Sequence, residues 1–395
     1  MHLFLNCLAA SSGGGLTYVR NVIPHLSERP ELRATVALAP KLRNGLGCPQ
    51  NISFIEMDLP AGAATRFCWE QSHLSRMIQE SGADVLISAG NFALWRSPVP
   101  QILLSGNSLY TSPDFRRDLR ARGAYRIWLD TLVRSFFARR SVRWADCTVA
   151  PSKAFADTLQ QWTGDKVVGL HHGFDPDIFF GDDTPLPSAL HDKINFGKSA
   201  LRLIFVSHYN YYRNFETLLE ALPYIRKGLG GRDVQLLLTC KLSTEEDSGS
   251  YRAESAADLI RRLGISDDVV ELGALPYQLL HHLLHACDIY VTPAYTETFA
   301  HPLVEAMACG LPVVASDLSV HREICGDAAV YFPRFSPQML AERVVQVAHS
   351  LALRKRLSEC ALERSREFSW RGHVDQIVAL AHSLKQANIA YSHAA

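Results

Sequence analysis

The sequence has 395 residues, of which 47% are hydrophobic and 20% charged, a composition typical of a globular protein with two domains of ordinary size. Its 40 basic and 40 acidic residues balance, which argues against a protein that binds nucleic acid through a basic surface. The nine cysteines include no Cys-x-x-Cys pair, so we expect no disulfide framework and no structural zinc site, and a reducing cytoplasm fits best.

Residues 1–6 lack the basic start and apolar run of a secretory signal, and no stretch approaches the roughly 20 apolar residues of a membrane span. The expected location is therefore the cytoplasm. Residues 134–144 (RSFFARRSVRW) alternate arginines with aromatic residues, as interfacial helices do. This leaves peripheral contact with the inner face of a membrane open. A partly buried domain helix with a basic solvent face is the simpler interpretation.

Short apolar runs alternate with segments of helical periodicity, which predicts parallel strands joined by crossover helices, an α/β fold. In the first half we expect strands at 3–8, 34–38, 84–88, 101–104, 147–150 and 167–170. Residues 176–187, rich in Pro, Gly and Asp, are predicted to be a connector. A second series of strands is expected at 201–206, 234–238, 269–272, 289–292, 313–315 and 329–332. The prediction is two doubly wound, Rossmann-like domains, 1–175 and 176–369, facing an interdomain cleft.

The last segment, 370–395, is predicted to be a helix with one apolar stripe. The residues that form this stripe are Val374, Ile377, Val378 and Ala381. Such a stripe has to be buried, and we expect the helix to dock back on the N-terminal domain.

The most informative stretch is 295–315 (YTETFAHPLVEAMACGLPVVA), which follows a predicted strand and opens a helix. Pro302 suits the first helical turn and Gly310 the end of the helix. A helix that begins near His301 or Pro302, at the carboxyl end of a parallel strand, points free N–H groups into the crevice where such folds bind ligands. A diphosphate suits that position, and the carboxylates of Glu297 and Glu305 can accept hydrogen bonds from sugar hydroxyls beside it.

The pattern Glu-x7-Glu followed by Ala-Met-Ala-x-Gly-x-Pro-Val resembles the donor signature of family 4 glycosyltransferases, retaining enzymes with the GT-B fold. The resemblance implies that Glu297 contacts the donor sugar and Glu305 the nucleotide ribose. The other donor-binding residues expected here are Phe299, Ala300, His301, Pro302 and Leu303. The alternative is a helix-capping acid followed by a solvent-facing one.

A second matching stretch, 204–221, again has a strand, a turn and a helix. The family usually places an arginine after this strand and a lysine five residues later, and His208 and Arg213 occupy those positions here. The resemblance implies that both neutralise the donor diphosphate, although a histidine is charged only when protonated. The alternatives are a surface residue for Arg213 and a turn residue for His208. Ser207 and Lys241 are further donor-binding candidates, and an exposed lysine is an equal alternative for Lys241.

The candidates on the acceptor side are fewer. Gly13, Gly14 and Gly15 resemble the family's glycine-rich acceptor loop, with a plain tight turn as the alternative. Asn107 stands near the position of the family's usual histidine, and it can hold a sugar hydroxyl but cannot act as a base. Arg66 is a weaker candidate, for which a structural role is the alternative.

No metal or other cofactor is expected. Asp175 and Asp177 match the D-x-D pattern of metal-dependent glycosyltransferases, but they follow a segment that resembles the end of the family's first domain, so we expect a linker. His281, His282 and His285 share a predicted helix but have no acidic partner nearby, and we expect them on the helix surface.

The functional hypothesis is a metal-independent, retaining glycosyltransferase that moves a hexose-type sugar from a UDP- or GDP-sugar to a saccharide, lipid-linked or small-molecule acceptor in polysaccharide assembly. Glu297 orients the donor sugar, while Arg213 and His208 stabilise the departing nucleoside diphosphate. The alternatives are a nucleotide-sugar epimerase on the same architecture and a non-catalytic protein that binds sugar nucleotides. The sequence leaves the base, the sugar, the acceptor and the oligomeric state open.

Overall fold

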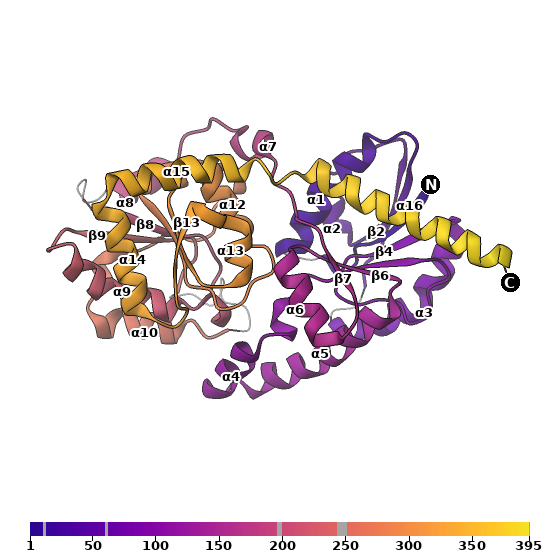
Figure 1. Cartoon of the computed structure of the whole chain (residues 1–395), viewed down its shortest axis with the longest axis horizontal. Coiled ribbons are helices and arrows are strands. Elements are labelled where there is room, and N and C mark those ends of the chain that lie inside the picture. The colour runs from indigo at the N-terminus through magenta and orange to yellow at the C-terminus, as the bar shows by residue number, and fades with distance from the viewer. Residues whose placement is uncertain (11–12, 60–61, 196–199, 243–250, 395) are drawn as a thin grey trace. The chain divides into compact units, whose positions relative to one another are not determined.

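The computed structural model describes residues 1–10, 13–59, 62–195, 200–242 and 251–394. The chain forms two compact units. The first contains Met1–Thr111, Gly123–Gly173 and Ser369–Ala395, and the second contains Ser112–Arg122 and Phe174–Phe368. Each unit has one parallel sheet with helices packed against it (Figure 1). The predicted α/β architecture of two Rossmann-like domains is therefore confirmed.

In the first unit seven described strands form a sheet in the order β3-β2-β1-β4-β5-β6-β7. Its elements are β1 (His2–Asn6), α1 (Gly13–Ser27), β2 (Arg33–Leu38), α2 (Pro40–Arg43), β3 (Ile52–Glu56), α3 (Ala63–Ser81), β4 (Val85–Ser88), β5 (Gln101–Leu104), the 3-10 turn η1 (Ser108–Tyr110), α5 (Tyr125–Trp144), β6 (Cys147–Ala150), α6 (Lys153–Thr163), β7 (Val167–Gly169) and α16 (Trp370–Ala394).

The central strand β1 places alternate side chains in two cores, because successive residues of a strand point to opposite faces of the sheet. Leu3 and Leu5 lie in a core with α1 and α16, whereas Phe4 lies in a core with α3. The sheet is therefore covered on both faces, which explains why its strands have nearly continuous apolar sequences.

Helix α16 lies along α1 and closes the first of these cores (Figure 1). The four stripe residues predicted from the sequence are all buried and belong to this core: Val374, Ile377, Val378 and Ala381. At the start of the helix, the backbone of Trp370 packs so closely on Gly173 that a Cβ atom there would lie 2.0 Å from the Trp370 nitrogen. Only glycine fits at this point, where the chain leaves the first unit.

In the second unit six described strands form a sheet in the order β10-β9-β8-β11-β12-β13. Its elements are α4 (Pro113–Ala121), α7 (Pro176–Phe180), α8 (Ser188–Asn195), β8 (Leu201–Phe205), η2 (Tyr211–Arg213), α9 (Phe215–Gly228), β9 (Val234–Leu238), α10 (Glu254–Leu263), η4 (Ser266–Asp268), β10 (Val269–Glu271), η5 (Tyr277–Leu279), α11 (Leu280–His285), β11 (Ile289–Thr292), α12 (His301–Ala308), β12 (Val313–Ser316), α13 (Ser319–Cys325), η6 (Gly326–Ala328), β13 (Ala329–Phe332), α14 (Pro337–His349) and α15 (Leu351–Ser365).

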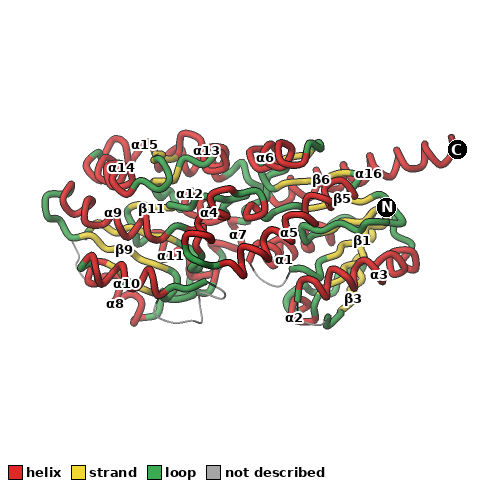
Figure 2. The backbone as a smooth tube through the Cα atoms, turned by 90° about the horizontal axis from the view of Figure 1, so that it is seen from below, coloured by secondary structure: helices red, strands yellow, loops and turns green. Residues whose placement is uncertain are grey.

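The order of the second sheet places a topological switch point between β8 and β11. From β8 the chain continues outward to β9 and β10, and from β11 it continues in the other direction to β12 and β13. Helices α10 and α14 both pack against α9, whereas α13 and α15 pack against α12 (Figure 2). In open parallel sheets the crevice for ligands opens at such a point, beyond the carboxyl ends of the two central strands.

The second unit also contains a segment from the first half of the chain. Residues Ser112–Arg122, which include α4, make their contacts with the second unit, although the sequence order suggests a place in the first. The crossover between the parallel strands β5 and β6 needs one helix, and α5 supplies it. Helix α4 is therefore an addition that the first sheet does not require.

The structure corrects three details of the sequence analysis. Strand β3 was missed because it is an edge strand that is only partly buried. The predicted connector contains α7, which Asp175 caps by accepting hydrogen bonds from the amides of Asp177 and Ile178, and Phe179 in this helix is fully buried. The expectation of a surface position for His281 is wrong, since it is 5% exposed and its ring pairs with the carbonyl of Asp182.

None of the helices in the described part of the chain is both long and apolar enough to cross a membrane.

Replacing Ile377 by alanine tests the contribution of α16 to the first core. Because Ile377 is 3% exposed, the substitution should lower the free energy of unfolding by about 2–5 kcal/mol. The matched control is Gln376→Ala on the exposed face of the same helix, which should change it by less than about 0.5 kcal/mol. Urea unfolding followed by tryptophan fluorescence measures both. Equal effects of the two substitutions would contradict this role.

Candidate functional site

The loop after β8 carries the first group of candidate residues. His208 is exposed on this loop. The neighbouring Ser207 donates its amide to the Thr239 hydroxyl at 3.0 Å and its hydroxyl to the His208 carbonyl at 2.8 Å. Arg213 ends the turn η2 and Asn214 adopts a left-handed conformation with φ of 57°. This conformation is tolerated best by glycine and asparagine, and it lets α9 begin directly after the turn.

The loop after β11 carries the second group. Helix α12 begins at His301, as predicted, with Pro302 in its first turn. Ala300, just before it, is buried and left-handed with φ of 66°, which is a strained conformation for an alanine. Gly310, with φ of 65°, ends the helix through a hydrogen bond from its amide to the Met307 carbonyl. The loop before α12 is therefore held in one defined shape.

The two loops are joined by three polar contacts. The guanidinium of Arg213 forms an ion pair with the carboxylate of Glu297. The amide of Tyr295 donates to the Tyr212 carbonyl at 3.0 Å. The side-chain amide of Asn214 donates to the Pro293 carbonyl, also at 3.0 Å. Two residues separated by 83 intervening positions, both singled out from the sequence, thus meet at the switch point of the sheet.

The surroundings of Arg213 favour the charged form of its side chain. Burial disfavours a charged guanidinium, but the facing carboxylate of Glu297 outweighs this effect, and the pKa of Arg213 is raised. Its Nε atom is buried and has no hydrogen-bond partner among the described residues. Arg213 therefore combines a permanent positive charge with a donor that is not used by the protein, which suits an anionic ligand.

Glu305 lies on α12 and is 6% exposed. Burial raises the pKa of this carboxyl to about 7, and a hydrogen bond from the Tyr277 hydroxyl opposes part of the shift. The buried Tyr290 on β11 interacts electrostatically with Arg213, Glu305 and Glu297. All three candidates therefore lie within electrostatic range of the same buried side chain.

His321 is a buried residue of the site that the sequence analysis missed. It is fully buried on α13, interacts electrostatically with Glu297, and burial lowers its pKa to about 4. Its Nδ1 atom lies 3.1 Å from both the hydroxyl and the carbonyl oxygen of Ser316, and that hydroxyl donates to the Ala294 carbonyl. The proton of the neutral ring therefore sits on Nδ1, which leaves Nε2 as a buried acceptor without a partner among the described residues. The only signal in the sequence was a histidine after a predicted strand.

The remaining donor-side candidates lie at the same edge of the sheet with less definite roles. Phe299 and Leu303 are almost fully buried, and the ring of Phe299 lies 4.8 Å from that of His301. Lys241 is exposed after β9, with its aliphatic stem near Gly273.

The acceptor-side candidates lie in the first unit. Gly13, Gly14 and Gly15 form the first turn of α1 after β1. Asn107 uses its side-chain oxygen to accept a hydrogen bond from the Leu109 amide at 3.0 Å, and thereby caps η1. Arg66 forms an ion pair with Glu70 at 3.5 Å, and Glu70 is 5% exposed with a pKa raised to about 7 by burial. The Arg66 and Asn107 side chains thus both have structural contacts.

Within the described ranges, no group of three or more His, Cys, Asp or Glu residues is arranged to hold a metal ion.

Comparison with known proteins finds relatives for the part of the chain that contains this site. Residues 188–364 match the family described as glycosyl transferases group 1. The matched part of the chain, which contains the ion pair and α12, is thus similar to the group 1 glycosyltransferases.

Individual relatives agree with this similarity. A phosphatidyl-myo-inositol mannosyltransferase of Mycobacterium leprae is 31% identical over 180 residues, 45% of each chain. A D-inositol 3-phosphate glycosyltransferase of Corynebacterium diphtheriae is 24% identical over 193 residues, 48% of this chain and 44% of the relative. The matched part thus spans less than half the length of these two relatives.

Solved structures match almost the whole chain. Sucrose-phosphate synthase from Thermosynechococcus elongatus superimposes with a TM-score of 0.75 at 17% identity, over 98% of this chain and 100% of that one. Anabaena HepE in complex with UDP-glucose gives a TM-score of 0.72 at 18% identity, over 97% and 100%. At such identities the match shows a shared fold, that of the two-domain GT-B glycosyltransferases.

Because the pKa of Glu305 is raised, we predict that this carboxyl lowers the free energy of unfolding as the pH rises. Between about pH 4.5 and 7 the native state binds more protons at this carboxyl than the unfolded chain, so its contribution to stability falls as the pH rises. Glu305→Gln removes the ionisation. The substitution should therefore raise the free energy of unfolding relative to the wild type by about 2 kcal/mol more at pH 8 than at pH 5. The exposed Glu342→Gln is the control, and a pH-independent difference for Glu305→Gln would contradict the burial argument.

Proposed function

We propose that this protein is a retaining glycosyltransferase that transfers a hexose-type sugar from a nucleoside-diphosphate sugar. The observation that carries the proposal is the pairing of Arg213 with Glu297 at the switch point of a domain that is similar to the group 1 glycosyltransferases. A UDP-sugar and a GDP-sugar are the two donor classes expected. The UDP-glucose in the solved HepE complex supports a nucleotide-sugar donor.

The chemistry expected of each group follows from its charge. As the bond between sugar and diphosphate breaks, negative charge grows on the leaving phosphate, and a fixed guanidinium stabilises it. Arg213 supplies this charge, with the free amides at the start of α12 beside it and His208 as a further donor. Glu297 holds hydroxyls of the sugar. The leaving phosphate takes the proton of the acceptor on the same face, so the reaction needs no metal and no separate protein base.

The acceptor is proposed to be a saccharide or a lipid-linked glycan. The relatives include a phosphatidyl-myo-inositol mannosyltransferase, whose name describes a lipid-linked acceptor, and D-inositol 3-phosphate glycosyltransferases. Gly13, Gly14, Gly15, Asn107 and Arg66 remain the proposed acceptor-side residues.

Replacing Glu297 tests the donor site. Glu297→Gln should lower kcat for sugar transfer, followed by release of the nucleoside diphosphate, by about 10²–10³-fold, because a group positioned for the transition state is lost. Binding of UDP or GDP, measured by calorimetry, should change little. Arg213→Gln should weaken nucleotide binding as well, since it removes the charge that faces the phosphates. The exposed Glu342→Gln is the matched control.

The stereochemistry of the product decides the mechanism. A screen of nucleotide sugars by thermal shift identifies the donor, since a ligand at 100 times its Kd adds about 2.7 kcal/mol of stability. Proton NMR of the transferred sugar should then show the anomeric configuration of the donor. An inverted product would overturn the proposed mechanism, and epimerisation without transfer would support the epimerase instead.

We further propose that the protein works at the inner face of a membrane, which it contacts through α5. Four apolar residues at a spacing of three or four lie on one face of this helix and are more than half exposed: Tyr125 64%, Leu129 58%, Val133 51% and Phe136 56%. A contiguous apolar face of this kind is unusual on a protein surface without a partner. Exposed arginines accompany it, including Arg126, Arg139 and Arg140, so the chemistry fits an anionic lipid surface.

Two acidic substitutions test this contact. Leu129→Glu combined with Phe136→Glu should reduce co-sedimentation with phosphatidylglycerol vesicles at least tenfold, because each apolar side chain contributes about 1.5–3 kcal/mol when buried. Leu351→Glu, at a residue that is 73% exposed on α15, is the control and should bind as the wild type does. Binding of the wild type that is equal for phosphatidylcholine vesicles, or an unchanged double variant, would rule out this surface.

A further inference from the structure

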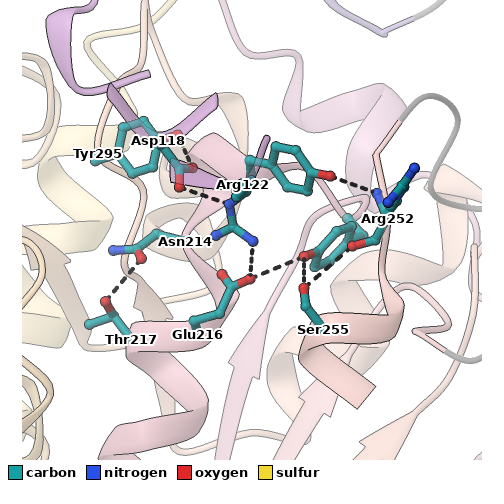
Figure 3. Close-up of polar contacts among 10 residues, drawn as sticks. Asp118, Arg122, Asn214, Glu216, Thr217, Arg252, Ser255 and Tyr295 are labelled. Atoms are coloured by element: carbon teal, nitrogen blue, oxygen red, sulfur yellow. Dashed lines mark hydrogen bonds and ion pairs between the residues drawn. The ribbon is translucent and has the colours of Figure 1, made fainter. Parts of the chain in front are cut away.

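The polar face of α4 contacts the loops that carry Arg213 and Glu297. The hydroxyl of Tyr295, two residues before Glu297, donates to the Asp118 carboxylate at 2.8 Å. The other oxygen of Asp118 accepts from Arg122 at 2.7 Å, one helical turn further on. Figure 3 shows this chain of contacts, with Asp118 between Tyr295 and Arg122.

Arg122 continues the network to the other loop. Its guanidinium donates to the Glu216 carboxylate at 2.8 Å (Figure 3). Glu216 lies in the first turn of α9, three residues after Arg213, and it also accepts from the Tyr209 hydroxyl at 3.1 Å. The guanidinium lies 4.3 Å from the centre of the Tyr211 ring, in the turn that ends with Arg213. The loops after β8 and β11 are thus connected a second time, through α4.

The rest of α4 fixes the helix on the second unit. Phe115 and Leu119 are fully buried, and the ring of Phe115 lies 6.2 Å from that of Tyr212. Asp114 forms an ion pair at 3.1 Å with Arg334, which follows β13. The helix therefore reaches three loops at the carboxyl edge of the sheet. The charged side chains of the network, Asp118, Arg122 and Glu216, are between 20% and 23% exposed, so water screens them only in part.

We propose that α4 is a positioning element for the donor site. Asp118 fixes the loop of Glu297 through Tyr295, and Arg122 fixes the loop of Arg213 through Glu216, so that the two loops keep a defined relative position. The inference rests on the proposed function for its catalytic consequence, whereas its structural consequence can be tested without activity. Neither Asp118 nor Arg122 is expected to touch the donor. They act through the residues that do, where a misplacement of about 1 Å can reduce a rate 100-fold.

The first test is amide hydrogen exchange of the full chain. Tyr295→Phe removes one hydroxyl while keeping the ring, and Asp118→Asn weakens its acceptor. Each should speed exchange in residues 295–301 by about tenfold or more, the effect of losing a hydrogen bond to a charged group. Exchange in the first unit should stay unchanged. Arg120→Gln, on the exposed side of α4, is the matched control. Unchanged exchange in this loop, or faster exchange throughout the second unit, would overturn the proposal.

The second test is kinetic and uses the donor identified for the wild type. Tyr295→Phe and Asp118→Asn should each lower kcat about 10- to 100-fold while the Kd for nucleoside diphosphate stays within about threefold. Because the two groups act as a pair, the double variant should be no slower than the slower single variant. Arg122→Lys should retain more activity than Arg122→Gln. Additive losses, or loss of thermal stability with unchanged kcat, would show a merely structural role.

The two tests separate the two proposals. A wild-type protein that neither hydrolyses nor transfers any nucleotide sugar would refute the proposed function, and the exchange measurement would still decide whether α4 holds the loop. An active wild type whose variants keep both the wild-type exchange and the wild-type kcat would refute the role of α4 alone.

Discussion

The ion pair between Arg213 and Glu297 is the interaction on which the interpretation of the second unit depends. It joins the ends of two neighbouring strands, in a place where both side chains are largely removed from water. Such a pair contributes little net stability, because desolvation of the two charges offsets their attraction. Removal of one partner leaves the other charge buried and is strongly unfavourable. The arrangement is thus better suited to binding than to stabilisation, since a diphosphate can replace or share the carboxylate as the partner of the guanidinium.

The position of this pair follows from the topology of the sheet. Strands β8 and β11 are neighbours, although two strands and three α-helices of the described chain separate them in sequence. Their loops meet because the connections leave them in opposite directions, so no crossover helix covers the space between their carboxyl ends. Glu305 and His321 come from the helices that follow β11 and β12 and approach the same region. Four charged or titratable groups, from the segments that follow β8, β11 and β12, are therefore brought together by the order of the parallel strands.

Much of this architecture could be predicted from the sequence, because it depends on local patterns. Apolar runs gave the strands that are buried on both faces, and Pro302 with Gly310 marked both ends of α12. Strand β3 was not predicted, because an edge strand carries polar residues at its exposed positions. Arg213 and Glu297 were recognised singly, through a family resemblance. Their pairing was not predicted, since it depends on which strands are neighbours, and that information does not reside in either segment.

The placement of helix α4 could not be predicted from local sequence patterns either. With nine residues it is too short to be stable alone, so packing and polar contacts have to hold it. Phe115 and Leu119 predict that one face is buried, but nothing in their spacing indicates which sheet they cover. The helix is encoded between two strands of the first unit, but its apolar face and its charged side chains contact the second unit. A second unit defined by sequence continuity alone, from residue 174 onward, would lack Asp118 and Arg122 and leave the Tyr295 hydroxyl and the Glu216 carboxylate without their charged partners. The functional unit is thus discontinuous in sequence, and the loop that carries Glu297 depends on residues supplied from the other half of the chain.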